Sequence, residues 1–194
     1  MNKATGIIIL IAILSLPNFM AGQTKFEREY RIREKDAPGK AVKFINAAFG
    51  NKKVKWYAEE SQDGRTIEAK TKFRKYKYSV EFDTSGNLQD IEKTIDFDEI
   101  DAEAVDEITK SLTIEFGDFK ILKIQVQYTS GNPETIREII KKGDSQQPFS
   151  KKYEIVLETR VDKAYKAFEV LIAEDGQIEK LLEMDLRTMD NMQF

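Results

Sequence analysis

The chain has 194 residues, of which 41% are hydrophobic and 34% are charged, and this is enough apolar material for one substantial core or two small ones. Lysine and arginine number 31 against 34 aspartates and glutamates, and no basic stretch stands apart from acids, so nucleic acid is excluded as an expected partner. Histidine and cysteine are absent, which excludes disulfides, thiol nucleophiles, thiolate or imidazole metal sites, and histidine-based acid–base catalysis.

The amino terminus has the order of residue types that is typical of a secretory signal. Lys3 provides a positive charge, residues 7–16 form an apolar core, and the small pair Ala21 and Gly22 follows after a break. The apolar core is shorter than the roughly 20 residues that a membrane-spanning helix requires, although residues 4–22 are long enough to span marginally if they are not removed. We expect cleavage after Gly22 or one residue earlier, and a mature protein in the periplasm or outside the cell without stable membrane insertion.

Two segments of the chain repeat one pattern of residues at a constant offset of 90. Residues 76–88 and 166–178 share alternating apolar positions, and each passes through a turn glycine, Gly86 in the first segment and Gly176 in the second. Glycine is favoured there because a tight turn requires a positive φ. The repetition predicts the same strand-and-turn unit twice.

An amphipathic helix is expected ahead of each unit, because apolar residues recur there at steps of four, at Ala41, Ile45 and Phe49 and at Ile108, Leu112 and Phe116. Each helix ends at a glycine, Gly50 or Gly117. The helices are offset by 67 residues and the later segments by 90, so about 23 extra residues (90 minus 67) lie in the second copy, near residues 130–150.

The segments after the first helix alternate between apolar and charged residues, as half-buried strands do. Short connections through Asp63-Gly64 and Gly86 predict antiparallel neighbours. One face of this sheet is expected to be apolar. The other carries a mixed-charge set that we expect to lie in solvent, namely Lys53, Lys55, Glu68, Lys70, Lys72, Lys77 and Glu81.

The predicted fold class is therefore α+β, with two tandem repeats that each place a helix on a small antiparallel β-sheet. We expect a signal peptide at residues 1–22, a first repeat at 23–98, and a second repeat at 99–194 that carries a helical insertion near 130–150.

These residues resemble the PepSY-like family of exported bacterial proteins, whose fold is similar to that of the β-lactamase-inhibitory protein. The resemblance rests on the helix, the Lys-Val-Lys-Trp strand after Phe-Gly, the strand Tyr-Ser-Val-Glu-Phe-Asp and the turn Ser-Gly-Asn-Leu, and it covers residues 36–187. It implies two tandem units with antiparallel sheets carried on helices, and no catalytic residues. The chain departs from the pattern at the insertion and at Lys123, which occupies the place of Trp56 in the second copy.

Two groups of acids are candidates for a metal site or a catalytic site. Residues 96–103 are rich in carboxylates but lack the glycine and the terminal glutamate of a calcium loop, so we expect no metal there. Asp83 and Asp175 lie in turns, where aspartate caps the local backbone, so we expect no catalytic role for them. No cofactor is expected.

Four aromatic residues are candidates for partner binding: Trp56, Tyr57, Tyr76 and Tyr78. The alternation places Trp56, Tyr76 and Tyr78 under the first helix as ordinary core, with an exposed concave sheet as the alternative, where aromatic rings serve as recognition anchors. Tyr57 falls on the charged face and is expected in solvent.

The insertion reads as a short helix that begins after Asn132, has Pro133 in its first turn and stops at Gly143. Ile136, Ile139 and Ile140 share one face of this helix and are further candidates for partner binding. One hypothesis is that deleting residues 131–149 leaves the fold intact and removes partner binding; an unfolded product would show that the helix is structural.

The sequence favours a non-catalytic, exported binding or inhibitory module that recognises an envelope or extracellular protein through a sheet surface or through the inserted helix. The alternative is a carrier that holds an apolar small molecule between the sheet and the helices, which requires an enclosed cavity of several hundred cubic ångströms. An enzyme that uses only carboxylates, tyrosines and lysines is the third and weakest possibility.

Overall fold

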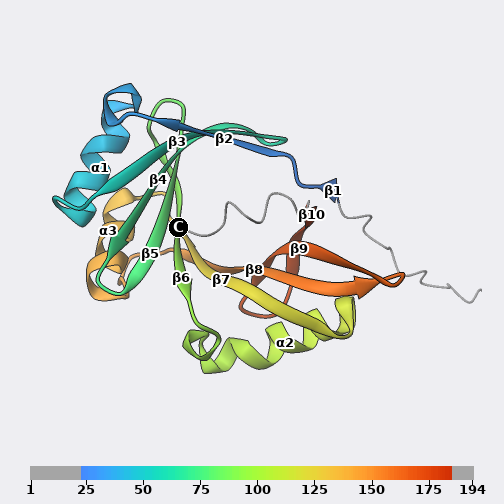
Figure 1. The fold of residues 1–194 in the computed structure, drawn as a ribbon. Helices are drawn as coiled ribbons and strands as arrows, with labels where there is room; N and C mark the ends of the chain where they lie inside the picture. The colour runs from blue at the N-terminus through green and yellow to red at the C-terminus, as the bar shows by residue number, and fades with distance from the viewer. Residues whose placement is uncertain (1–22, 185–194) are drawn as a thin grey trace, which may run out of the picture.

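The computed structural model describes residues 23–184, so the signal expected at residues 1–22 lies outside the described residues. The described chain forms three α-helices, α1 (Gly39–Phe49), α2 (Ala102–Phe116) and α3 (Pro133–Lys142). Its strands are β1 (Gln23–Thr24), β2 (Glu27–Ile32), β3 (Val54–Ser61), β4 (Gly64–Phe73), β5 (Tyr76–Asp83), β6 (Leu88–Ile95), β7 (Phe119–Thr129), β8 (Ser150–Val161), β9 (Ala164–Ala173) and β10 (Ile178–Met184). The predicted α+β class is confirmed (Figure 1).

All ten strands belong to one sheet, in the order β1-β10-β9-β8-β7-β6-β5-β4-β3-β2. Every neighbouring pair is antiparallel except β1 and β10, which run parallel. The prediction of two small sheets is wrong in this respect. Strand β6 pairs directly with β7, from Ile91 opposite Tyr128 to Ile95 opposite Ile124, and these hydrogen bonds join the first half of the chain to the second.

The helices cover one face of the sheet, and aromatic contacts fix them there. Helix α1 packs on β5, where the ring centroid of Phe49 lies 5.3 Å from that of Tyr78. Helix α2 packs on the second half, where the rings of Phe116 and Phe168 are 5.2 Å apart. Each helix ends at a glycine with positive φ, Gly50 or Gly117, as the sequence predicts. Within residues 23–184, none of the helices is both long enough and apolar enough to cross a membrane.

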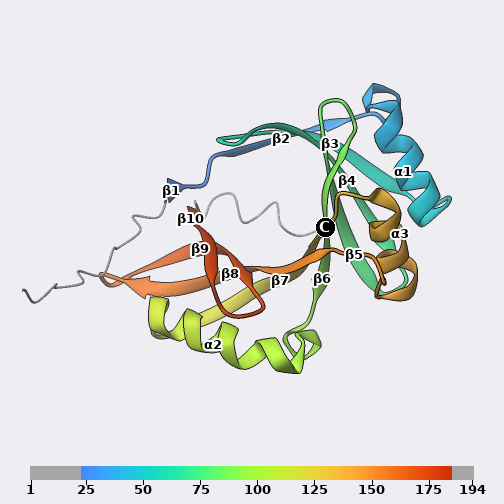
Figure 2. The same cartoon turned by 180° about the vertical axis from the view of Figure 1, so that it is seen from behind.

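Helix α3 forms where the sequence predicts it, but it packs against the first half of the chain. The side chain of Asn132 accepts a hydrogen bond from the backbone N–H of Glu134 at 3.0 Å, Pro133 occupies the first turn, and Gly143 adopts the left-handed conformation at the end. Figures 1 and 2 show α3 beside α1, and the two helices are in contact. The inserted segment therefore completes the cover over the first half of the sheet.

The two segments of similar sequence form similar turns. Between β5 and β6, the N–H of Gly86 donates to the carbonyl of Asp83 at 2.9 Å; between β9 and β10, the N–H of Gly176 donates to the carbonyl of Ala173 at 3.0 Å. The φ angles are +83° at Gly86 and +81° at Gly176. Each turn also touches a helix, since a Cβ at Gly86 would lie 2.7 Å from Pro38 Cβ and one at Gly176 would lie 2.7 Å from the carbonyl oxygen of Glu107.

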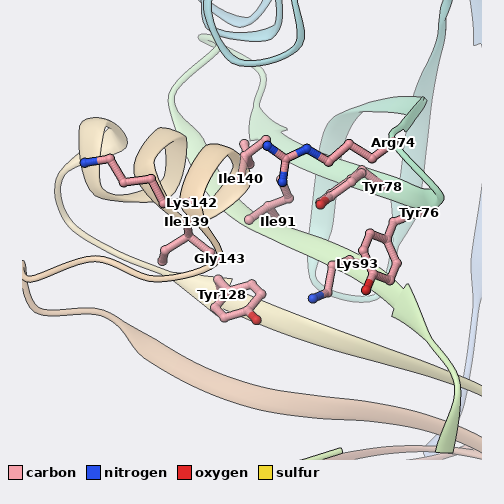
Figure 3. Close-up of a pocket in the computed structure, with 10 residues that line it drawn as sticks. All are labelled: Arg74, Tyr76, Tyr78, Ile91, Lys93, Tyr128, Ile139, Ile140, Lys142 and Gly143. Carbon is pink, nitrogen blue, oxygen red and sulfur yellow. The ribbon is translucent and has the colours of Figure 1, made fainter. Parts of the chain in front are cut away.

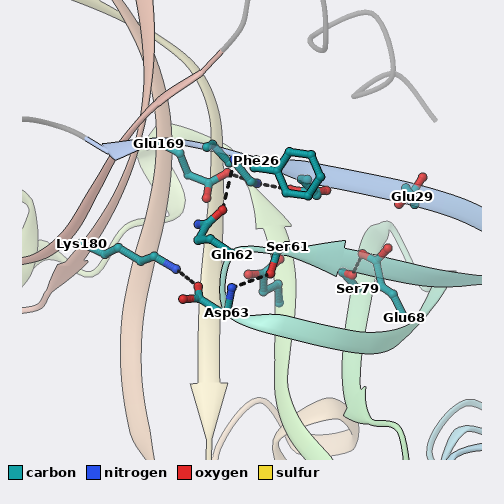
Figure 4. Close-up of polar contacts among 12 residues, drawn as sticks. Phe26, Glu29, Ser61, Gln62, Asp63, Glu68, Ser79, Glu169 and Lys180 are labelled. Atoms are coloured by element: carbon teal, nitrogen blue, oxygen red, sulfur yellow. Dashed lines mark hydrogen bonds and ion pairs between the residues drawn. The ribbon is translucent and has the colours of Figure 1, made fainter.

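The sheet curls until its two ends approach each other, because one short stretch of chain pairs with both. Strand β1 bonds to β10 at one end of the order, and β2, which follows it in sequence, bonds to β3 at the other. Between them the N–H of Phe26 donates to the side chain of Gln62 at 3.1 Å (Figure 4). Lys180 on β10 also reaches Asp63, at the tip of the β3–β4 hairpin, with a 2.5 Å contact.

Candidate functional site

The structure places five of the seven candidate residues in the core. The exposed fraction is 2% for Trp56, 8% for Tyr78, 0% for Ile136, 5% for Ile139 and 3% for Ile140. Trp56 packs beside Phe82 under the helices, as the alternation predicts. Because these side chains are buried in the folded chain, none of the five offers a free surface to a partner protein.

Tyr76 and Tyr78 lie together on β5, beside the end of α3. Tyr78 is 8% exposed and packs on Phe49, while Tyr76 is half-buried and donates its hydroxyl hydrogen to Glu99 at 2.7 Å. Both residues line a small pocket together with Ile139 and Ile140. The structure thus brings together residues that the sequence named separately, one pair from a strand and one from the inserted helix.

Tyr57 lies on the opposite face of the sheet, which is rich in carboxylates. Residues directly opposite one another on neighbouring strands share a face, and the register places Tyr57 opposite Glu68, Glu68 opposite Glu81, and Glu81 opposite Asp90. Tyr57 is half-buried rather than fully in solvent, and the Lys70 ammonium lies 5.0 Å from its ring centroid. We call this surface the acidic face and define it by Glu59, Glu68, Glu81, Asp90, Glu92, Glu154 and Glu169.

The acidic face is enclosed by the curl of the sheet. Glu68, which the sequence assigned to a solvated stripe, is only 7% exposed, and its side chain accepts a hydrogen bond from the hydroxyl of Ser79 (Figure 4). Gln125, at 3% exposure, donates to Glu92 at 2.9 Å. Its own side-chain oxygen is buried and has no hydrogen-bond partner within residues 23–184. The face therefore holds a buried acceptor that lacks a donor in this part of the chain.

Burial raises the pKa of carboxyls on the acidic face, because the charged form loses water that the protein does not replace. Burial is the largest cause throughout, and the charges of neighbouring carboxylates add to it at Glu81, Glu59 and Glu92. The pKa rises to about 9 for Glu81 and about 8 for Glu59, and it is also raised for Glu68, Asp90, Glu92 and Glu169. These groups hold protons near neutral pH that carboxyls in water would have lost.

Two lysines neutralise part of the acidic face. Lys25 contacts Glu169 at 2.7 Å and also pairs with Glu27, and Lys70 contacts Glu68 at 2.9 Å and also pairs with Glu29. Within the described part of the chain, Glu59, Glu81 and Asp90 form no ion pair. The lysines therefore leave the centre of the acidic face without a neutralising cation.

Sequence reasoning found part of this surface and missed the rest. The alternation placed Glu68 and Glu81 on one charged face, but the acids of β6, β8 and β9 were not connected with them. A usable signal exists in Asp90, Glu92 and Glu154, which recur at alternate positions of later strands. It becomes interpretable only when the strand order is known.

The acids that are candidates for catalysis or metal binding in the sequence have local structural roles. Asp83 accepts hydrogen bonds from the backbone N–H groups of Ser85 and Asn87, and Asp175 accepts one from the N–H of Gln177. In the run 96–103, Asp96 and Glu99 form a reciprocal cap. Among residues 23–184, no group of three or more acids has the geometry to hold a metal ion.

The fold is similar to that of solved structures from Bacteroides species. A candidate periplasmic protein from Bacteroides eggerthii matches with a TM-score of 0.51 and 12% identity over 79% of this chain and 94% of that one. A BLIP-like protein from Bacteroides fragilis gives a TM-score of 0.46 and 12% identity, over 76% and 86%. A DUF2874 family protein from Bacteroides ovatus gives 0.49 and 11%, over 76% and 87%.

No protein-family model and no curated protein sequence matches the chain. The match to the Bacteroides eggerthii structure, at 12% identity, establishes a shared fold and nothing about chemistry.

Proposed function

We propose that this chain is an exported, non-catalytic binding protein that takes a cationic segment of another protein against the acidic face of its sheet. The observation that carries the proposal is the row Glu68, Glu81 and Asp90, which lie opposite one another on three neighbouring strands. Like charges held together away from water are costly, and such arrangements are concentrated at functional sites.

A lysine or arginine from a partner would offset this cost. It would supply the positive charge that Glu81 and Asp90 lack within residues 23–184, and a donor for the buried side-chain oxygen of Gln125. Burial has already removed most of the water from these groups, so little further desolvation accompanies binding. A cation next to these carboxyls lowers their pKa, so binding should release protons.

The acidic face is favoured over the inserted helix as the binding surface. Ile136, Ile139 and Ile140 are buried against the first half of the sheet, and a partner would have to displace α3 to reach them. The carrier alternative has no support in two pockets that lie within residues 23–184. One is about 220 Å³ and is lined by charged and phenolic groups as well as isoleucines, so it does not suit a wholly apolar ligand; the other is an open hollow beside Phe97 and Phe119.

The compartment and the family are part of the same proposal. The order of charge, apolar core and small residues in positions 1–22 supports export to the periplasm or beyond. The matching turns at Gly86 and Gly176, each touching a helix, support a PepSY-like organisation in two repeats, 23–98 and 99–194. The expected partner is therefore an envelope or extracellular protein.

Calorimetry with a short extended peptide that carries lysine at alternate positions tests this function. In two buffers of different ionisation enthalpy, binding should release protons and weaken with added salt. The double variant Glu81→Gln/Asp90→Asn should bind at least about tenfold more weakly, because it removes the two carboxyls that would ionise next to the lysines of the peptide. The matched control is Glu103→Gln/Asp106→Asn, two exposed acids on α2, which should bind the peptide as the unaltered chain does.

Equal binding of the lysine peptide and its glutamine counterpart, or equal loss in both double variants, would contradict the proposal. If the lysine peptide binds as expected, capture from a cell-envelope fraction with the same two variants would identify the natural partner, because its binding should depend on Glu81 and Asp90.

A further inference from the structure

A pocket of about 220 Å³ opens between the end of α3 and strands β5, β6 and β7, on the face opposite the acidic face. Its polar lining includes Tyr78, Lys93 and Tyr128, and its apolar lining consists of Ile91, Ile139 and Ile140 (Figure 3). The register makes the polar groups neighbours: Tyr78 is directly opposite Lys93, and Tyr128 is directly opposite Ile91.

Lys93 is placed where the sheet otherwise buries apolar side chains. Its neighbours on the same face, Ile91 and Ile95, are 1% and 6% exposed and belong to the core. Within residues 23–184, Lys93 forms no ion pair, and its ammonium lies 4.7 Å from the centroid of the Tyr76 ring. Glu99, whose charge acts on Lys93, is already bonded by Lys75 and Tyr76.

The electrostatic surroundings leave the Lys93 charge uncompensated. Burial lowers the pKa of Lys93, the charge of Glu99 opposes this, and the positive charges of Lys151 and Lys75 lower the pKa further. Arg74 adds another cation at the rim, where its guanidinium donates to the carbonyl of Lys141 at 2.9 Å. An ammonium at the edge of a core, without a counter-ion, is unfavourable unless an anion binds to it.

Two phenol groups beside Lys93 lack partners. Neither the Tyr78 hydroxyl nor the Tyr128 hydroxyl has a hydrogen-bond partner in the part of the chain that the structure describes. Burial raises the pKa of Tyr78 to about 12 and also raises the pKa of Tyr128, so both keep their protons and can donate them. Figure 3 shows these hydroxyls and the Lys93 ammonium around one opening.

We propose that this pocket binds a carboxylate that carries a small apolar group, with Lys93, Tyr78 and Tyr128 holding the carboxylate and Ile91, Ile139 and Ile140 contacting the apolar group. The ammonium of Lys93 matches the single negative charge of a carboxylate, and the ammonium and the two hydroxyls supply hydrogen-bond donors for its four lone pairs. A cavity of about 150 Å³ accommodates benzene, so this pocket has room for about ten non-hydrogen atoms. The site is independent of the acidic face and of the function proposed for it.

Phenylacetate is a suitable probe, because it combines a carboxylate with one ring. Backbone and side-chain NMR spectra of the mature protein should show shifts of Ile91, Ile139 and Ile140 resonances on titration, with at least millimolar affinity. The amide phenylacetamide, which has the same shape and no charge, should bind at least about tenfold more weakly.

The variants separate binding from folding. Lys93→Met should weaken the binding of phenylacetate at least about tenfold, because it removes the positive charge that holds the carboxylate. It should leave the thermal midpoint of unfolding unchanged or higher, because it removes an unpaired ammonium from an apolar face. Tyr128→Phe should also weaken binding. The matched controls are Lys110→Met on α2 and Tyr165→Phe, which is 64% exposed at the start of β9, and both should bind as the unaltered chain does.

A free small acid and the carboxyl end of a peptide share this chemistry, and N-acetylphenylalanine distinguishes them. Tighter binding of N-acetylphenylalanine than of phenylacetate would indicate a peptide end, and weaker binding would indicate a free acid. The proposal is overturned if phenylacetate causes no shifts in the pocket, if phenylacetamide binds equally well, or if Lys93→Met leaves the affinity unchanged.

Discussion

Gly176 joins the β9–β10 turn to helix α2, and two separate constraints act on it. Its φ of +81° is costly for any residue with a Cβ, and a Cβ there would lie 2.7 Å from both the carbonyl oxygen of Glu107 and the hydroxyl oxygen of Ser111. Gly86 repeats this arrangement against the start of α1. At both positions the glycine sets how closely a hairpin approaches its helix.

Gly176→Ala is expected to lower the free energy of unfolding by about 2–4 kcal/mol, from backbone strain plus an overpacked contact. Gly117→Ala is the matched control, because Gly117 has a φ of +67° and nothing within 4 Å of an added Cβ. It should lose only about 1–2 kcal/mol. Denaturant unfolding measures both; equal losses would show that the helix contact adds nothing.

At the scale of the element, α3 is an inserted helix that has become part of the core. Its three isoleucines face the first half of the sheet, and its end is tied to the β4–β5 turn by the hydrogen bond from Arg74 to the carbonyl of Lys141. Deleting residues 131–149 would uncover Ile91 and the flank of α1. The burial of α3 therefore favours the structural outcome of the deletion over the loss of partner binding alone.

Ile136→Ala tests the structural role of α3 without removing the helix. Ile136 is 0% exposed, so the substitution should lower the free energy of unfolding by about 2–5 kcal/mol through lost burial and a cavity. Ile114→Ala, on α2, makes the same chemical change at a side chain that is 77% exposed. It should change stability by less than about 0.5 kcal/mol, and a similar loss in both variants would count against a buried α3.

At the scale of the whole molecule, the curl of the sheet creates two unlike surfaces. One face carries the helices and the apolar core. The other turns inward, which desolvates carboxyls that an open sheet would leave in water. Lys25 supports this arrangement from the link between β1 and β2, since it reaches Glu169 on β9. Sheet closure and the chemistry of the acidic face are therefore coupled.

The stability of the chain should fall as pH rises from 5 to 8.5. The pKa values of Glu81 and Glu59 rise to about 9 and about 8 in the folded state, so over this window the folded chain holds protons that the unfolded chain has lost. Stability falls wherever the folded state binds more protons. Lys70 has a raised pKa, and its stabilising effect is fully present throughout this window. Glu99 has a pKa lowered to about 2, so its stabilising effect is lost only at acid pH, below this window.

Thermal and denaturant unfolding at several pH values measure this dependence. We expect a decrease of at least about 2 kcal/mol between pH 5 and pH 8.5, and a smaller decrease in Glu81→Gln, which cannot take up the negative charge. Asp106→Asn, an exposed acid on α2, should keep the slope of the unaltered chain. A flat or rising profile would mean that these carboxyls are ionised in the folded protein.

Local patterns in the sequence were sufficient for the elements. The spacing of Ala41, Ile45 and Phe49 identified α1, and Asn132 with Gly143 bounded α3 almost to the residue. Capping and turn formation depend on neighbours within a few residues, so the sequence displays them directly. An aspartate ahead of a helix does not always cap it: Asp36 lies in a 3-10 turn bonded to Arg33, and α1 begins at Gly39.

By itself, the sequence determined the α+β class, the places of the helices and hairpins, and the absence of thiol and imidazole chemistry. Only the tertiary structure decided that β6 joins β7 in one sheet, that Ile136 is buried against the first half, that Glu68 is buried and that Lys93 is half-buried. The physical reason is that periodicity reports which side of a strand a residue occupies. Whether that side faces water depends on contacts between strands far apart in the chain.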